Sequence, residues 1–368
     1  MKFVISRDAL LKPLNLVAGV VERRHTLPIL SNVMLVVVGN QLSITGTDLE
    51  VELEGRVALE YTPNSGGEIT VPARKLADIC KSLPDGSDIE FTVADDRVTV
   101  IAGRSRFSLS TIAAADFPNV EEGPGNHRFA VKQGDLKRLI DRTSFAMAQQ
   151  DVRYYLNGML WEVNEGYLRM VATDGHRLAM CTLEATTDSS ELLQVILPRK
   201  GVIELSRLLI NEDQAVQVVI GSNHIRATTS DFTFTSKLVD GKFPDYDRVL
   251  PKQSTKAIFG NRDELRQAFS RTAILSNEKY RGVRLSLTDG SLKIVANNPE
   301  QEEAEEIVSV DYAGEDLEIG FNVSYLLDVL AVLSGDKVRL SLSDPNSSAL
   351  LEESEQGDSR YVVMPMRL

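Results

Sequence analysis

The chain has 368 residues, of which 43% are hydrophobic and 25% are charged, and its formal net charge is −13. At about 100 to 200 residues per domain this length predicts two or three globular domains, and the negative charge, taken alone, argues against binding to nucleic acid. The longest apolar run, VMLVVV at 33–38, is too short to cross a membrane, and MKFVIS meets charged residues too early for a signal peptide, so we expect a cytoplasmic protein.

Six segments carry apolar residues at the helical interval of three and four positions. In chain order these predicted helices lie at 6–21, 70–84, 132–147, 196–209, 261–275 and 320–334. Apolar and polar residues alternate in the segments between them, and Gly, Asp and Asn bound these segments. The alternation predicts antiparallel strands, among them 41–46, 97–103, 217–230 and 337–344.

The helical segments form two series that recur at a spacing of about 125 residues, as internal repeats do. In one series Pro72, Pro198 and Asn322 stand at the expected helix starts, where a missing or capped N–H costs little. In the other series the segments SRDALLKP, KQGDLKRL and NRDELRQA correspond. Each unit is therefore expected to be an α+β domain with two helices packed on an antiparallel sheet. The expected domains are 1–122, 129–250 and 251–368, with boundaries in EEGPGNH and LPKQSTK.

The segment ATDGHRLAM at 172–180 gathers Asp174 and His176 in a way that suggests an active-site loop. It aligns, however, with GTDLEVELEG in the first repeat, where the same Thr-Asp pair stands at 47–48. We therefore expect both pairs to form turns between paired strands, with the carboxylate accepting hydrogen bonds from nearby backbone N–H groups. A hydrolase that uses Asp174 and His176 stays an alternative, and it would need a nucleophile or further ligands within reach.

Motifs for other chemistries are missing from the sequence. It contains no GxSxG, Walker A, HExxH or EF-hand pattern, and GPGNHR lacks the third glycine of a dinucleotide fingerprint. Cys80 and Cys181 form no CxxC pattern, and the four histidines share no ligand spacing. We expect two buried thiols, no metal site and no cofactor.

Several long strings occur in order along the whole chain: DVRYYLNGM, TDGHRLAM, SKLVDGKFPDY, ANNPEQEEAEE and YVVMPMRL. Together they resemble the bacterial DNA polymerase III beta subunit family, the replicative sliding clamps. The resemblance implies the DNA-clamp fold and a ring made by a head-to-tail homodimer, whose helices line a hole that holds duplex DNA. It also implies a non-catalytic processivity factor that tethers the polymerase and is opened by a clamp loader.

Opposite charges distinguish the two ends of the predicted ring segment. The first repeat offers GRSRFSLST, a basic and apolar strand, whereas the third offers TAILSN and the acidic PEQEEAEE. This contrast suits a strand-pairing interface that hides sticky edges. The resemblance implies an interface made by Lys75, Arg104, Arg106, Phe107, Leu109, Ile274, Leu275, Glu300 and Glu302.

Basic residues gather on the predicted helices although acidic residues exceed basic ones in the chain, 53 to 40. If the apolar stripes face the sheets, these cations, Arg74 and Lys200 among them, meet phosphates in the hole without reading sequence. The resemblance implies further DNA contacts at Arg24, Gln150, Tyr154 and Tyr155. A repeat scaffold that binds peptides but no DNA is the other alternative.

The apolar C-terminal segment YVVMPMRL is expected to be docked rather than frayed. The resemblance implies a hydrophobic groove there for short linear peptides. Their expected sources are the DNA polymerase III alpha subunit, the delta subunit of the clamp loader, other polymerases and repair proteins. The expected groove residues are Leu156, Thr173, Gly175, His176, Arg177, Leu178, Pro244, Arg248, Val249, Val362, Val363, Met364, Pro365, Met366 and Arg367.

Overall fold

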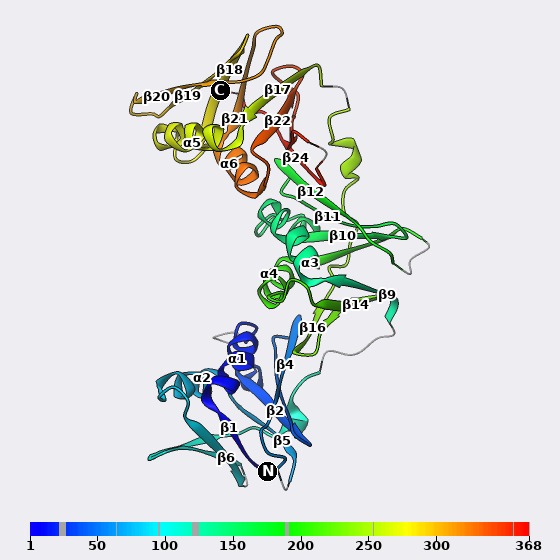
Figure 1. Ribbon diagram of the computed structural model, residues 1–368, viewed down its shortest axis with the longest axis vertical. Helices are drawn as coiled ribbons and strands as arrows, with labels where there is room; N and C mark the ends of the chain where they lie inside the picture. Colours follow the sequence, from blue (N-terminus) through cyan, green and yellow to red (C-terminus); the bar gives the residue numbers. More distant parts are fainter. Residues whose placement is uncertain are drawn as a thin grey trace. The chain divides into compact units, whose positions relative to one another are not determined.

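The structure, a computed structural model, describes residues 1–21, 27–63, 65–94, 96–119, 125–187, 191–252, 254–355 and 357–367. In this part of the chain it contains six α-helices (Figure 1): α1 (Arg7–Ala18), α2 (Ala73–Ser82), α3 (Gln133–Asp141), α4 (Arg199–Leu208), α5 (Arg262–Thr272) and α6 (Val323–Val332). Each lies inside one of the six segments that the sequence predicts as helical. None of the helices within these ranges has the length and apolar character that a membrane span requires.

Side chains cap the N-termini of three helices with hydrogen bonds. Ser6 accepts a hydrogen bond from the Ala9 N–H at 3.4 Å, and Asn261 accepts one from the Glu264 N–H at 3.0 Å. Asn322 caps α6 by accepting from the Ser324 N–H at 2.9 Å. These side chains satisfy N–H groups that the first helical turn leaves without partners.

The described strands form four sheets in which every recorded pairing is antiparallel. One four-stranded sheet has the order β1 (Lys2–Ser6), β6 (Asp88–Ala94), β7 (Arg97–Ala102) and β8 (Ser105–Ser110). The other has the order β20 (Glu303–Ser309), β19 (Ser291–Asn297), β18 (Gly282–Thr288) and β21 (Leu317–Asn322).

The two remaining sheets have eight strands each. The first has the order β5 (Gly67–Pro72), β2 (Asn32–Val38), β3 (Gln41–Thr47), β4 (Val51–Ala58), β16 (Phe232–Lys237), β15 (His224–Thr228), β14 (Ala215–Gly221) and β9 (Gly125–Lys132). The second has the order β13 (Leu193–Pro198), β10 (Gly158–Asn164), β11 (Tyr167–Thr173), β12 (Arg177–Glu184), β24 (Ser359–Val363), β23 (Ala349–Glu353), β22 (Lys337–Leu342) and β17 (Lys256–Asn261). Each of these sheets joins strands of two repeats.

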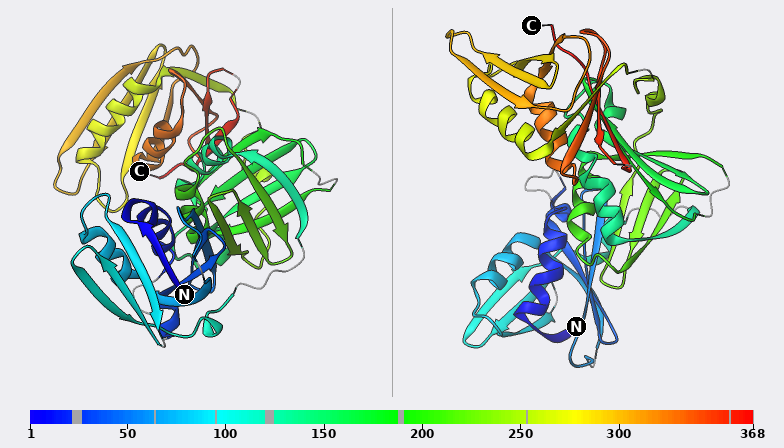
Figure 2. Two further views of the ribbon diagram at one scale, coloured as in Figure 1. Left: turned by 60° about the horizontal axis from the view of Figure 1, so that its bottom comes forward. Right: turned by 45° about the horizontal axis from the view of Figure 1, so that its top comes forward.

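The chain divides into two compact units, 1–136 with 200–238, and 137–199 with 239–368. Within the first, α1 buries Leu10, Leu14 and Val17 and packs against α2, β3 and β4. Within the second, α5 (yellow) and α6 (orange) lie side by side on the strands β19 to β21 (Figure 2). The predicted α+β class, with helix pairs packed on antiparallel sheets, is confirmed.

Both cysteines are buried free thiols, as the sequence predicts. Burial raises the pKa of Cys80 and that of Cys181 to about 11, so neither is a thiolate near neutral pH.

Candidate functional site

The Thr-Asp pair of the second repeat forms the predicted turn, between β11 and β12. The Thr173 hydroxyl donates to the Arg177 carbonyl at 2.6 Å and accepts from the Gly175 N–H at 3.1 Å. Asp174 Oδ1 accepts from the N–H groups of His176 and Arg177 at 2.9 and 3.1 Å, and its Oδ2 accepts from Arg177 Nε at 3.1 Å. Both carboxylate oxygens of Asp174 therefore serve the turn.

The first repeat builds the same turn between β3 and β4. Thr47 makes the two equivalent hydroxyl bonds, at 3.0 and 3.1 Å, and Asp48 Oδ1 accepts two backbone N–H bonds at 2.9 and 2.7 Å. The third turn residue has a positive φ in both copies, 77° at Leu49 and 88° at Gly175. The prediction of a shared structural turn is thus confirmed by matching hydrogen bonds.

A hollow of about 150 Å³ opens beside this turn, in the second compact unit. It is lined by Arg153, Leu156, Thr173, Gly175, Arg177, Pro244, Val249, Val362 and Met364. All but the first of these belong to the predicted peptide groove. We call this hollow the groove pocket.

The floor of the groove pocket is made where β12 pairs with β24. Leu178 lies opposite Val362 in that pairing, and both are buried in one apolar cluster. The chain then leaves β24, and the Met364 N–H donates to the His176 carbonyl at 2.9 Å. The C-terminal segment is therefore docked as expected, with the Met364 side chain partly exposed at the rim.

Arg177 is held on every side. Its Nη1 forms an ion pair with Asp328 of α6, and its Nη2 donates to the Phe145 carbonyl at 2.8 Å. Its guanidinium also lies 4.5 Å above the Tyr325 ring. A stacked and fully bonded guanidinium is a rigid wall for a pocket rather than a free charge.

Arg153 was missed by sequence reasoning, although it lines the groove pocket. It binds Asp151 through Nε at 3.0 Å and Nη2 at 2.9 Å, and these hydrogen bonds lower the pKa of Asp151 to about 2. Asn157 ties the same loop by donating to the Asp151 carbonyl at 2.8 Å. A side chain at Gly175 would place Cβ 2.9 Å from Arg153 Nη2, so the glycine leaves room for this guanidinium.

The remaining predicted groove residues lie around or beyond the groove pocket. His176 is exposed, Val363 is buried, Pro365 is half-buried, and Arg248 is exposed and paired with Asp245 at 2.8 Å. Met366 and Arg367 line a separate hollow of about 330 Å³, shared with Arg284, Glu318, Ile319, Gly320, Pro345 and Asn346. The structure therefore does not bring these last two residues into the groove pocket.

The predicted DNA-contacting residues differ in their exposure and in their contacts. Arg24 lies outside the described residues. Tyr154 is 57% exposed, Tyr155 is half-buried, and their rings meet edge to face at 5.8 Å. Gln150 is exposed with a φ of 55°, and Arg74 is exposed on α2. Lys200, at the start of α4, forms an ion pair with the buried Asp48.

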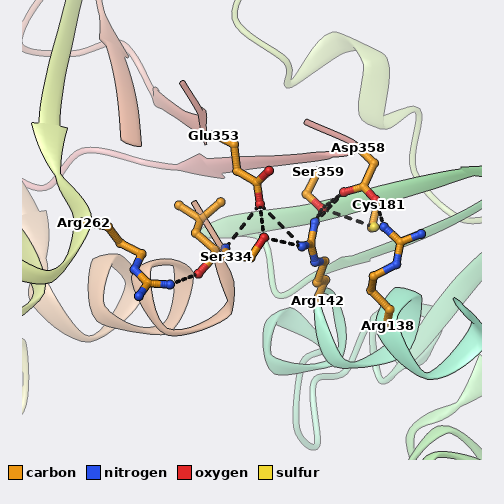
Figure 3. A network of polar contacts seen from close by, with 9 residues as sticks. Arg138, Arg142, Cys181, Arg262, Ser334, Glu353, Asp358 and Ser359 are labelled. Atoms are coloured by element: carbon orange, nitrogen blue, oxygen red, sulfur yellow. Dashed lines mark hydrogen bonds and ion pairs between the residues drawn. The ribbon is translucent and has the colours of Figure 1, made fainter. Parts of the chain in front are cut away.

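Arg138 of α3 and Arg142, which directly follows this helix, are engaged inside the second unit (Figure 3). Arg138 and Arg142 both pair with Asp358, and Arg142 also lies 3.4 Å from Glu353. Burial alone would raise the pKa of Asp358, but the Ser359 hydroxyl and the two guanidinium groups outweigh burial and lower it. These two arginines therefore brace the start of β24.

Three of the predicted interface residues, Arg106, Phe107 and Leu109, lie on β8. Arg104 precedes that strand, Lys75 lies on α2, Ile274 and Leu275 lie in the 3₁₀ turn Ala273–Leu275, and Glu300 and Glu302 precede β20. Among the described residues β8 pairs only with β7, and β20 only with β19, so each has one free edge. Ile274 is 75% exposed, and Ile307, which the sequence reasoning did not select, is 65% exposed. Leu109 is buried, and Phe107 and Leu275 are half-buried. The charged members are exposed: Lys75, Arg104, Arg106, Glu300 and Glu302.

Three family models match the chain, all of the DNA polymerase III beta subunit: its N-terminal domain at residues 1–121, its central domain at 130–245 and its C-terminal domain at 247–367. The beta sliding clamp of Pseudomonas aeruginosa is 68% identical over 368 residues, and that of Escherichia coli K12 is 56% identical, each covering 100% of both chains. A crystal structure of the P. aeruginosa clamp bound to griselimycin has a TM-score of 0.98 with 68% identity and 100% coverage of both chains.

Proposed function

The chain belongs to the DNA polymerase III beta subunit family, and from that premise we propose that two copies of it close head to tail into a ring around duplex DNA. The chain is a DNA sliding clamp, a processivity factor without catalysis of its own. The hydrolase alternative is therefore dropped. We further propose that its three domains span 1–122, 129–250 and 251–368, and that it acts in the cytoplasm.

The joints within the chain suggest how the ring closes. β4 of the first repeat pairs with β16 of the second, and Leu53 lies opposite Phe234 there. β12 of the second repeat pairs with β24 of the third, and Ala179 lies opposite Tyr361. Each joint pairs a strand of one repeat with a strand of the next repeat. The corresponding strands that have no such partner within the described chain are β20 of the third repeat and β8 of the first. Pairing β20 with β8 of a second copy would repeat the joint and cover both free edges.

Strand correspondences give the register of this third joint. Phe107 on β8 and Phe234 on β16 are phenylalanines on corresponding strands, where they lie opposite Val100 and Ala227, and we match them on that basis. Ala304 pairs with Ala296 as Ala179 pairs with Ala172, so these strands correspond as well. The two equivalences support a register with Phe107 opposite Ala304 of the second copy.

In an antiparallel pair this register fixes the neighbours. Arg106 would then face Glu305, and Leu109 would face Glu302, with Glu303 on the diagonal from Arg106. Glu303 and Glu305 join the proposed interface, which otherwise keeps Lys75, Arg104, Arg106, Phe107, Leu109, Ile274, Leu275, Glu300 and Glu302. Cross-strand charges of opposite sign favour this pairing over an association of like ends.

For DNA we propose contacts by Arg24, Gln150, Tyr154, Tyr155, Arg74 and Lys200. Exposed Arg74 and Tyr154 supply charge and a stacking surface, whereas Asp48 engages part of the Lys200 charge. Such contacts weaken steeply with salt and read no sequence, so retention would come from encirclement.

For protein partners we propose that the groove pocket and its surroundings take short linear peptides. The proposed sources are the DNA polymerase III alpha subunit, the delta subunit of the clamp loader, other polymerases and repair proteins. An apolar floor with a rigid arginine wall and an adaptable methionine at the rim suits apolar anchors of such peptides. Each occupied groove would raise the local concentration of a polymerase at the primer end.

The single observation that carries the ring proposal is the pair of free edges, β8 and β20, left by two matching joints. The decisive experiment compares the lifetime of the protein, after loading by a clamp loader, on nicked circular DNA and on the same DNA after linearisation. Encirclement predicts long retention on the circle and rapid loss from free ends. Equal lifetimes, or the absence of DNA retention, would instead support the peptide-binding scaffold.

A further inference from the structure

The segment 239–250, which connects the second and third repeats, forms one wall of the groove pocket. Its Pro244 and Val249 line the pocket. The segment begins with a hydrogen bond from the Val239 N–H to the Ile196 carbonyl at 2.9 Å. Between these points Phe243 is buried in the apolar cluster that also contains Leu178 and Val362. The position of this segment therefore sets the width of the groove pocket.

We call segment 239–250 the wall segment. Its Tyr246 connects the apolar cluster to a buried polar group. Its ring belongs to the cluster beneath the pocket, and the residue is 5% exposed. Its hydroxyl lies 3.0 Å from both carboxylate oxygens of Glu162 and accepts from Arg169 Nη1 at 2.9 Å. Because burial raises the pKa of Tyr246 to about 12, the hydroxyl keeps its proton at every working pH.

Glu162 is a buried carboxylate, only 3% exposed, in a strand whose other buried side chains are apolar. Besides Tyr246 it accepts from Tyr167 at 2.9 Å, from Arg169 at 3.1 Å and from Gln194 at 2.8 Å. A buried charge is tolerated only with such partners, and bonds to it are stronger than neutral ones. The network spans β10, β11 and β13, so three paired strands hold Glu162 independently of Tyr246.

Packing alone would hold the wall segment without fixing where it lies. Leu160 and Glu162 are two residues apart on β10 and so share a sheet face, as Val171 and Arg169 do on β11. The apolar end of this face attracts the segment without directional preference. The polar end of this face, Glu162 with Arg169, binds the Tyr246 hydroxyl in a single position. A displaced Tyr246 would leave buried polar atoms without partners.

We propose that Tyr246, Glu162 and Arg169 are positioning residues of the groove pocket, which hold the wall formed by Pro244 and Val249 at the spacing that peptides require. This inference rests on the proposed peptide-binding function. None of the three residues lines the pocket, so their effect on affinity is exerted through the wall segment.

The test uses Tyr246→Phe, which keeps the ring and removes the hydroxyl. Tyr312→Phe is the matched control, since Tyr312 is 6% exposed and its hydroxyl donates to the Glu315 carbonyl at 2.7 Å, away from the groove pocket. Affinity for a fluorescein-labelled peptide from the tail of the polymerase III alpha subunit is measured by fluorescence polarisation on the full-length dimer. Loss of one positioning hydrogen bond is expected to weaken binding about fivefold in Tyr246→Phe and to leave Tyr312→Phe at the wild-type value.

A double-mutant cycle with Glu162→Gln separates positioning from general destabilisation. If Tyr246 acts through Glu162, the dissociation constant of the double variant is close to that of the single variant with the lower affinity. If the two residues act independently, the fold-changes in the dissociation constants of the single variants multiply. Wild-type affinity in Tyr246→Phe, equal weakening in Tyr312→Phe, or multiplying effects in the cycle would each overturn the inference. If the wild-type protein itself fails to bind the peptide, the proposed function fails instead.

Discussion

The proposed register of the inter-chain joint can be tested by reversing one charge. Arg106 would face Glu305 of the second copy, with Glu303 on the diagonal. A cross-strand pair of opposite charges contributes roughly 0.2 to 1 kcal/mol, and like charges destabilise by a similar amount. Arg106→Glu should therefore cost about 1 to 2 kcal/mol at each interface once the diagonal is included.

A closed dimer has two identical interfaces, and both must open before the copies separate. The cost to the dimer is then about 2 to 4 kcal/mol, which raises its dissociation constant about 30-fold to 1,000-fold. Sedimentation velocity over a dilution series measures this constant directly. The matched control is Arg339→Glu, because Arg339 is exposed on β22, which is paired on both sides within its sheet.

The compensating variant decides whether the register is right. Glu305→Arg should weaken the dimer by itself, and the double variant Arg106→Glu with Glu305→Arg should recover most of the lost affinity. A double variant that stays as weak as the single ones would show that these residues are not opposed. An Arg106→Glu dimer as tight as the Arg339→Glu control would refute the edge-pairing argument itself.

Further outcomes follow from the groove, the DNA contacts and the buried ion network. Deleting 364–368 should abolish peptide binding in fluorescence polarisation while light scattering still shows a dimer, because Met364 lines the groove pocket; retained peptide affinity would count against the groove. Arg24→Ala should shorten retention on nicked circular DNA and flatten its salt dependence, and an unchanged salt slope would argue against a phosphate contact. Asp358→Asn should lower the free energy of unfolding at pH 7 by about 1 to 3 kcal/mol, since Arg138 and Arg142 lose their shared carboxylate. The pKa of Asp358 is lowered in the folded state, so its contribution is present above about pH 4 and is lost as pH falls further; urea unfolding should show wild type and variant converging on the acid side, and a constant gap would contradict this.

Much of the fold could be predicted from the sequence because the signals were local and repeated. Helical periodicity placed all six described helices, since an apolar stripe must be buried wherever a helix forms. The Thr-Asp turns were predictable for a similar reason, because a short side chain bonds its own backbone whatever surrounds it.

What sequence reasoning missed depends on contacts between distant segments. Arg153 lines the groove pocket because its guanidinium lies against Gly175, a contact that the spacing of the two residues does not reveal. Tyr246 and Glu162 are 84 residues apart, and nothing in the sequence indicates that they are in contact. Glu305 enters the proposed interface only through strand register, which one alternating segment cannot specify by itself.

The turn shared by the first two repeats shows how triplication of a module leaves freedom for divergence. Leu49 tolerates the same left-handed backbone that Gly175 adopts, so that conformation alone does not demand a glycine. What differs in the second copy is the guanidinium of Arg153, which packs where a Cβ at position 175 would lie. The first two copies thus keep one turn, while a single position of the second copy contributes to a receptor site.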